Sequence, residues 1–199
     1  ATEMIDIVFD LGGETLSAAH PFALWAELLR LAPQLAEQKH IGVLPLRLTA
    51  TGEGMLLPKR AKLVLRLTTH LADQVAACLS GQPMEVDGNR LQLGQGKKRQ
   101  IRPSPTIHAQ MVAGVADEVL FMDDINTQLN ELGVSGNLIC GKRHTLAGKQ
   151  QCISGFSLVI HDLKPEASLK LQYAGLGGSR QFGLGIFIPY KVISGLSDD

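Results

Sequence analysis

The chain has 199 residues, of which 45% are hydrophobic and 19% are charged, and its formal net charge at pH 7 is zero. A chain of this length can bury one sizeable core or two small ones. Zero net charge argues against a protein that binds nucleic acid through charge alone, as histones do. Any contact with nucleic acid must therefore depend on a local group of charges and on the shape of the binding surface.

The sequence also bounds the compartment and the chemistry of the protein. No apolar stretch approaches the ~18 residues that a membrane span needs, and the first residues lack a signal-peptide pattern. Three cysteines, Cys78, Cys140 and Cys152, are odd in number and lack metal-type spacing. We therefore expect a cytoplasmic protein with free thiols, no disulfide framework, no metal, no cofactor and no membrane contact.

Strand and helix periodicities alternate along residues 4–93. Trp25, Leu28 and Ala32, for example, fall on one face of a helix. The predicted elements are a strand at 4–9, a turn at 11–15, a helix from Pro21 to near Pro33, a hairpin with strands around 44–48 and 63–67 and a turn at 52–54, a helix capped by Thr69 and closed by Gly81, and a strand at 85–93 with a tight turn at Asp87 and Gly88.

The same order repeats after a polar stretch at residues 94–105. The predicted elements are a strand at 107–115, a helix at 117–132 stopped by Gly133, strands at 137–146 and 150–160, a short helix from Pro165, and a strand at 186–193. Each half follows the order βαββαβ. We therefore predict an α+β protein with two tandem ferredoxin-like (RRM-like) domains, 1–94 and 106–199, joined by a basic linker at 95–105.

Residues 175–185 (GLGGSRQFGLG) hold five glycines around Arg180. A loop this rich in glycine lets the backbone approach a ligand and exposes N–H groups to anions, of which phosphate is the foremost. A dinucleotide fingerprint needs a strand, then glycines, then a helix, whereas here a helix precedes the glycines and a strand follows. This order favours contact with a polynucleotide backbone, and the alternative is a flexible turn without a ligand.

Two ferredoxin-like halves, His20 at the start of the first helix, and the segment GGSRQFGLGIFIP resemble the CRISPR-associated endoribonucleases that process precursor CRISPR RNA, the sixth Cas family. The resemblance covers nearly the whole chain. It implies binding of a CRISPR repeat RNA, often as a stem-loop, and one metal-independent cut by 2′-hydroxyl attack that leaves a 2′,3′-cyclic phosphate and yields mature guide RNA. Other CRISPR-associated effector subunits are further partners that the resemblance allows.

Such a cut needs a general base, a proton donor for the leaving 5′-oxygen and positive charge near the phosphorane. His20 and His40 are the candidate catalytic residues, because histidine titrates near neutral pH. At the start of a helix, His20 would be held neutral by the helix dipole and could act as the base. The first helix contains no tyrosine, which argues against a tyrosine-assisted mechanism.

Basic and glycine residues supply the candidate RNA contacts, although an ordinary solvated linker remains an alternative for the first group. The predicted contacts lie in the linker, in the second hairpin and in the glycine-rich loop: Lys97, Lys98, Arg99, Arg102, Lys142, Arg143, Gly177, Gly178, Ser179, Arg180, Gly183 and Gly185.

Two other functions stay open on the sequence alone. The first is a non-catalytic RNA-binding subunit of a CRISPR effector complex, built on the same fold. The second is an α+β domain that binds a nucleotide or another phosphate compound through the glycine-rich loop. Mutation of His20 would leave RNA processing unchanged in the first case, and hairpin RNA would not bind in the second.

Overall fold

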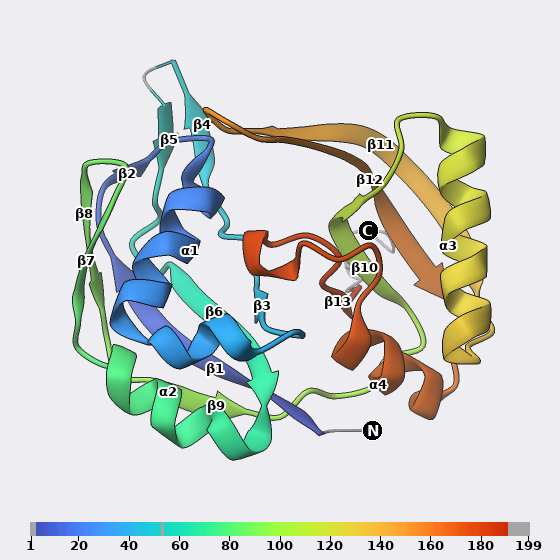
Figure 1. Cartoon of the computed structure of the whole chain (residues 1–199), viewed down its shortest axis with the longest axis horizontal. Coiled ribbons are helices and arrows are strands. Elements are labelled where there is room, and N and C mark those ends of the chain that lie inside the picture. Colours follow the sequence, from blue (N-terminus) through green and yellow to red (C-terminus); the bar gives the residue numbers. More distant parts are fainter. Residues whose placement is uncertain (1–2, 53, 191–199) are drawn as a thin grey trace, which may run out of the picture.

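A computed structural model describes residues 3–52 and 54–190 and shows two α/β units side by side (Figure 1). The first unit is built around a sheet in the order β3-β6-β1-β8-β7, with β9 paired to β1. Its elements are β1 (Met4–Gly12), α1 (His20–Leu31), η1 (Pro33–Glu37), β3 (Gly42–Val43), β6 (Lys62–Thr68), η2 (Thr69–Leu71), α2 (Ala72–Leu79), β7 (Pro83–Val86), β8 (Asn89–Leu93) and β9 (Lys97–Arg99). A small separate sheet joins β2 (Thr15–Leu16), β5 (Gly54–Leu56) and β4 (Thr49–Thr51).

The second unit has a four-stranded sheet in the order β11-β12-β10-β13. Its elements are β10 (Ile107–Ala113), α3 (Glu118–Leu132), β11 (Asn137–Ala147), β12 (Cys152–His161), α4 (Pro165–Ala174), η3 (Arg180–Phe182) and β13 (Ile188–Pro189). In both units the first strand lies between the third and the last, and both pairings are antiparallel. That arrangement is the ferredoxin-like one, so the predicted fold class is confirmed.

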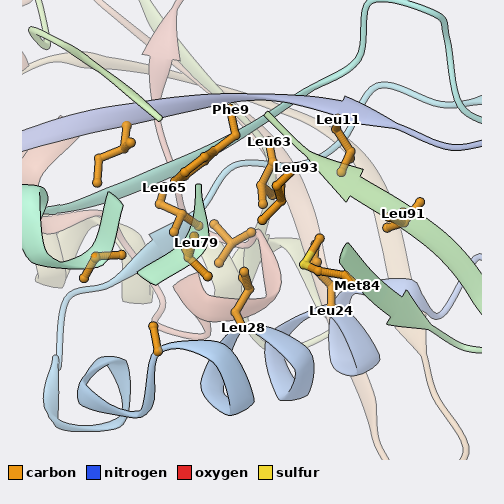
Figure 2. Packing of buried hydrophobic residues seen from close by; sticks show 14 of the residues in the cluster. Phe9, Leu11, Leu24, Leu28, Leu63, Leu65, Leu79, Met84, Leu91 and Leu93 are labelled. Carbon is orange, nitrogen blue, oxygen red and sulfur yellow. The ribbon is translucent and has the colours of Figure 1, made fainter. Parts of the chain in front are cut away.

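Each unit buries one face of its sheet under its helices. Strand alternation turns Phe9, Leu63 and Leu65 toward Leu28 of α1 and Leu79 of α2 (Figure 2), and all five side chains are fully buried. The second core is built in the same way, with Phe121 of α3 and Phe156 of β12 at a ring distance of 4.7 Å. The opposite face of the first sheet carries Asp6 and Arg66 and faces the second unit.

Several local predictions are confirmed. Asp87 and Gly88 turn the β7–β8 hairpin with positive φ angles of 50° and 78°, as a tight hairpin requires. Gly133 ends α3 in the left-handed region at φ 69°, and Asp117 caps its start by accepting from the Leu120 N–H.

Three predictions about the first half are wrong. The predicted turn at 11–15 begins as strand, because Leu11 is buried and pairs with Leu93. The strand predicted around 44–48 is reduced to β3, and Pro45, which lacks an N–H, follows directly. The turn predicted at 52–54 lies between β4, which ends at Thr51, and β5, which begins at Gly54, and does not close the predicted hairpin.

Thr69 does not cap a helix. It begins η2, its hydroxyl donates to the carbonyl of Glu3, and α2 starts only at Ala72.

The two ends of the second half are also shorter than predicted. β10 stops at Ala113, and the last strand is only Ile188–Pro189 within the described residues. Ile186 and Phe187 are buried but unpaired in the sheet, and Pro189 offers no N–H. Residues 191–193 of the predicted strand lie outside the described residues.

Candidate active site and RNA-binding surfaces

His20 is the first residue of α1 and is 9% exposed. Its ring Nδ1 lies 2.7 Å from the backbone oxygen of Ser17, which also accepts the His20 backbone N–H at 3.1 Å. A carbonyl can only accept, so Nδ1 carries the proton. The neutral ring therefore has its lone pair on Nε2, for which the described residues provide no hydrogen-bond partner.

Two opposing effects set the pKa of His20. Burial lowers it below the ordinary histidine value, and this effect is the largest, while the hydrogen bond to Ser17 and the carboxylate of Asp87 partly offset it. The imidazole is therefore neutral near pH 7. A neutral imidazole with a free Nε2 has the protonation state of a general base.

Segments from both units meet beside His20. Phe22, two residues further along α1, packs edge-on against Phe182 of η3 with ring centroids 4.8 Å apart. The turn between β11 and β12 lies against the same ring, since a Cβ added at Gly148 would come within 2.7 Å of it. The helix start, the glycine-rich loop and the hairpin tip thus form one neighbourhood.

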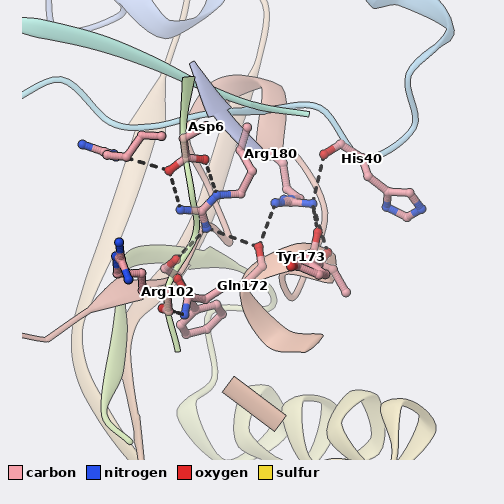
Figure 3. A network of polar contacts seen from close by, with 10 residues as sticks. Asp6, His40, Arg102, Gln172, Tyr173 and Arg180 are labelled. Carbon is pink, nitrogen blue, oxygen red and sulfur yellow. Dashed lines mark hydrogen bonds and ion pairs between the residues drawn. The ribbon is translucent and has the colours of Figure 1, made fainter. Parts of the chain in front are cut away.

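His40 is exposed and lies beyond the opposite end of α1, after η1. Its backbone oxygen accepts a hydrogen bond from Arg180 at 3.0 Å, and its imidazole points away from that contact (Figure 3). A helix of 12 residues is about 18 Å long. The two candidate histidines therefore flank the glycine-rich loop from different ends of α1.

The glycine-rich loop has a fixed, left-handed backbone. Gly177, Gly178, Ser179, Gly183 and Gly185 all have φ between 57° and 88°. At Gly177 a Cβ would meet the Ala113 carbonyl oxygen at 2.6 Å, and at Gly185 it would overlap the Leu176 carbonyl oxygen. Glycine is needed at both places for conformation and for space.

Both ends of this loop are tied to the second unit. The N–H of Gly185 donates to the Met111 carbonyl at 2.8 Å, and the N–H of Gly177 donates to the side chain of Gln128 at 2.9 Å. In contrast, the four successive N–H groups of residues 178–181 have no acceptor among the described residues. Consecutive free N–H groups in such a turn form an anion-binding concavity.

Arg180 is only 4% exposed and does not point outward in this structure. Its guanidinium donates to the carbonyls of His40 at 3.0 Å and Tyr173 at 2.7 Å, with a longer contact to Gln172 at 3.4 Å (Figure 3). Burial and the neighbouring Arg66 lower the pKa of Arg180 to about 10. These donors are occupied inside the chain, so the predicted contact of Arg180 with a phosphate has no support in the geometry.

A second buried arginine joins the two units. Arg66 is 2% exposed, holds both carboxylate oxygens of Asp6 at 2.8 and 3.1 Å, and donates to the carbonyls of Gln172 and Phe187. Arg66 and Arg180 therefore share the Gln172 carbonyl and fix α4 and the loop after it to the first sheet. The sequence offered one signal for this contact, which is a single arginine among the leucines of β6.

A cleft of about 1020 Å³ opens between the two units on the sheet face away from α1. Asp6 is the one carboxylate among the described residues that line it, and Arg66 and Arg99 neutralise that carboxylate. The cleft is therefore strongly basic. Its cationic residues are Arg47, Arg60, Lys62, Arg66, Arg99 and Arg102.

The predicted basic linker contributes to this cleft only in part. Residues 97–99 form β9, where Arg99 pairs with Asp6 and Lys98 with Ile7 of β1. Alternation turns Arg99 into the cleft, whereas Lys98 lies 3.0 Å from Asp73 on the helix side. Arg102 also lines the cleft, and Lys97 is exposed.

Sequence reasoning did not propose Arg60, Lys62 or Tyr190 as ligand contacts, although all three line the cleft. The run PKRAK, residues 58–62, was the available signal for the two cations. Tyr190 is 43% exposed and packs edge-on against His108 at 5.1 Å.

Lys142 and Arg143 are exposed on β11, the edge strand of the second sheet. The register between β11 and β12 shifts between Cys140 and Arg143, which is a bulge that locally redirects side chains. These cations lie along the hairpin whose tip contacts Phe22, so an extended ligand could reach both them and His20.

Within residues 3–52 and 54–190, no group of three or more His, Cys, Asp or Glu side chains is placed to hold a metal ion. The three cysteines are free. No helix of the described part of the chain is long and apolar enough to cross a membrane.

The family model described as Cas6 Crispr matches residues 5–192. The CRISPR-associated endonuclease Cas6 of Myxococcus xanthus (strain DK1622) is 30% identical over 187 residues, which is 93% of this chain and 81% of that protein. A solved CRISPR associated protein Cas6 matches 95% of this chain and 100% of its own, with a TM-score of 0.68 at 11% identity. Thermus thermophilus Cse3, solved with an RNA representing a pre-cleavage complex, matches 93% of this chain and 98% of its own, with a TM-score of 0.56 at 16% identity.

Fold and family together define the class, a CRISPR-associated endoribonuclease with two ferredoxin-like units. The chain belongs to the Cas6 family. The resemblance inferred from the glycine-rich loop and the repeated βαββαβ order is thereby confirmed at the level of the family.

Proposed function

We propose that this protein is a metal-independent cytoplasmic endoribonuclease that binds CRISPR repeat RNA and cuts precursor CRISPR RNA to give mature guide RNA. The observation that carries the proposal is His20, a buried and neutral histidine whose Nε2 is free and which lies beside the glycine-rich loop. The family relationship supports CRISPR RNA as the substrate.

In the proposed reaction, Nε2 of His20 takes the proton of the 2′-hydroxyl 5′ of the cut. The 2′-oxygen forms a bond to phosphorus, and the bond from phosphorus to the 5′-oxygen breaks. The leaving 5′-oxygen takes a proton from solvent water, and the other product ends in a 2′,3′-cyclic phosphate. The free N–H groups of residues 178–181 are the proposed donors to the phosphorane oxygens.

RNA binding is proposed to use two kinds of contact. The exposed cations of β11, Lys142 and Arg143, would neutralise phosphates of a stem beside the site. The basic cleft, with Arg99 and Arg102, would hold further backbone. The exposed Lys97 is proposed as a further contact, and Lys98 as a weaker one because Asp73 engages it.

His40 is the second catalytic candidate, and its exposed ring is available as a proton donor. His40 lies beyond the opposite end of α1 from His20, which makes a shared role at one phosphate less favourable than a role for either residue alone.

The proposal is tested by single-turnover cleavage of the host's own repeat RNA, in chelator, with His20→Ala and with His40→Ala as the matched variant. We expect His20→Ala to lose about 10²–10⁴ of the rate while RNA affinity changes little. An unchanged rate for His20→Ala with a large loss for His40→Ala would move the base to His40.

The same assay separates the two other functions. Tight binding without any cut by the unmodified protein would identify a non-catalytic RNA-binding subunit. Binding of a mononucleotide without affinity for hairpin RNA would identify a nucleotide-binding domain.

A further inference from the structure

The segment that leads into α1 is fastened to the β7–β8 turn by two side-chain hydrogen bonds. Ser17 Oγ donates to Asp87 Oδ2 at 2.6 Å, and Thr15 Oγ1 donates to Asn89 Oδ1 at 3.0 Å. Both bonds join residues about 70 positions apart in the chain. These bonds therefore tie the segment before α1 to the turn of the last hairpin of the first unit, and Ser17 is the nearer of the two residues to the helix.

Ser17 connects this fastening to His20 directly. Its backbone oxygen accepts from Nδ1 of His20, and its hydroxyl donates to the carboxylate of Asp87. The chain of contacts therefore runs from Asp87 through Ser17 to the imidazole. Both links are at hydrogen-bond distance, 2.6 and 2.7 Å, and Ser17 is the one residue between Asp87 and His20.

The carboxylate of Asp87 exceeds what its turn requires. At φ 50° the position favours Gly, Asn or Asp, and the neutral residues would meet that requirement equally well. Only a carboxylate both accepts the Ser17 hydroxyl and places a negative charge near an imidazole that becomes positive when it takes a proton.

We propose that Asp87, acting through Ser17, is a positioning residue that holds the His20 ring with Nδ1 protonated and Nε2 presented to the substrate. The proposal rests on the proposed function of His20. It adds a third component to the proposed site, the carboxylate of Asp87, beside the histidine and the glycine-rich loop.

The electrostatic sign follows from the groups around the ring. Asp87 is the charged group that raises the pKa of His20, against the larger lowering by burial. The other segments near the helix start carry two cations, Arg180 in the glycine-rich loop and Lys149 in the β11–β12 turn. The guanidinium of Arg180 donates to backbone carbonyls and not to the imidazole. Removal of the Asp87 charge must lower the pKa of His20, because a nearby carboxylate favours the protonated, positive imidazole.

The test compares Asp87→Asn, Ser17→Ala and the matched variant Thr15→Ala, which removes the neighbouring fastening bond but not the link to His20. Single-turnover cleavage of repeat RNA is measured from pH 5 to 8 together with RNA affinity. We expect Asp87→Asn to lower the plateau rate roughly 10- to 100-fold, with affinity unchanged. Its acidic limb should move to lower pH, because a base with a lower pKa stays deprotonated further into acid.

Ser17→Ala keeps the backbone carbonyl and the turn, so it tests the link if Asp87→Asn folds poorly, and a smaller loss of rate is expected. Thr15→Ala should match the unmodified protein. An Asp87→Asn variant with the unmodified rate and limb would overturn the proposal.

A readout without RNA separates failure of this inference from failure of the proposed function. NMR titration of the His20 imidazole in the protein alone should give a lower pKa in Asp87→Asn than in the unmodified protein. If the protein cut no RNA, the proposed function would fail while this titration still measured the coupling of Asp87 to His20. Identical titrations would show that the coupling itself is absent.

Discussion

The glycine-rich loop and the basic cleft offer a ligand different groups, backbone N–H in the loop and cationic side chains in the cleft. The loop carries one cation, Arg180, whose guanidinium is buried against carbonyls, and its N–H groups at residues 178–181 have no acceptor among the described residues. The cleft exposes guanidinium and ammonium groups, among them Arg60 and Arg102. A charge counted in a sequence is therefore not always a charge that a ligand meets, and the two regions should respond differently to mutation and to salt.

The largest expected effect on stability comes from Arg180→Ala. This variant leaves the partly buried carbonyls of His40 and Tyr173 without the donor they share, which should cost about 2–3 kcal/mol of unfolding free energy. Chemical denaturation measures it, and Arg102→Ala is the exposed control. Because Arg180 does not face solvent, the dependence of RNA affinity on salt should keep its slope. A slope reduced by about one with unchanged stability would instead place Arg180 on a phosphate.

The next effect separates two glycines of the same loop. Both Gly178 and Gly185 have positive φ, but a Cβ at Gly185 would overlap the Leu176 carbonyl oxygen while one at Gly178 meets nothing within 4 Å. Gly185→Ala should therefore lose about 2 kcal/mol or more of stability, and Gly178→Ala about 1 kcal/mol. The exposed Gly178 should in turn matter more for RNA affinity. Equal stability losses in denaturation would contradict this division.

The smallest effect on stability is expected for Arg143→Ala on β11. The side chain is exposed, so the unfolding free energy should change by less than about 0.5 kcal/mol. If Arg143 contacts a phosphate, the logarithmic salt slope of RNA affinity should fall by about one. Titrations of hairpin RNA across a salt series measure this, and a wild-type slope would remove Arg143 from the binding surface.

Periodicity was sufficient for the fold because α1, α2, α3 and the central strands bury a regular apolar face, as Leu63 and Leu65 do in β6. Glycine spacing likewise located the loop, whose conformation requires glycine at Gly177 and Gly185. Local patterns failed at the turn predicted at 11–15, because pairing of Leu11 with the distant Leu93 extends β1 there. Pro45 ended a strand that the leucine alternation favoured.

The parts of the site that depend on neighbouring residues were predictable, and the parts that depend on contacts across the fold were not. His20 at a helix start follows from the adjacent Pro21, whereas the burial of Arg180 depends on His40 and on α4 in space. The cleft exists only where the two units meet, so no single segment indicates it. Ser17 and Asp87 are joined across 70 residues, and no pattern in either segment predicts that bond.

We propose that the substrate's own 2′-hydroxyl attacks the phosphate with His20 as the base. It is tested most directly with repeat RNA that carries 2′-deoxyribose at the nucleotide 5′ of the cut, incubated with the unmodified protein in chelator beside the all-ribose RNA. We expect cleavage of the all-ribose RNA to a 2′,3′-cyclic phosphate, and equally tight binding but no cleavage of the deoxy substrate. Cleavage of the deoxy substrate at the same bond would contradict it.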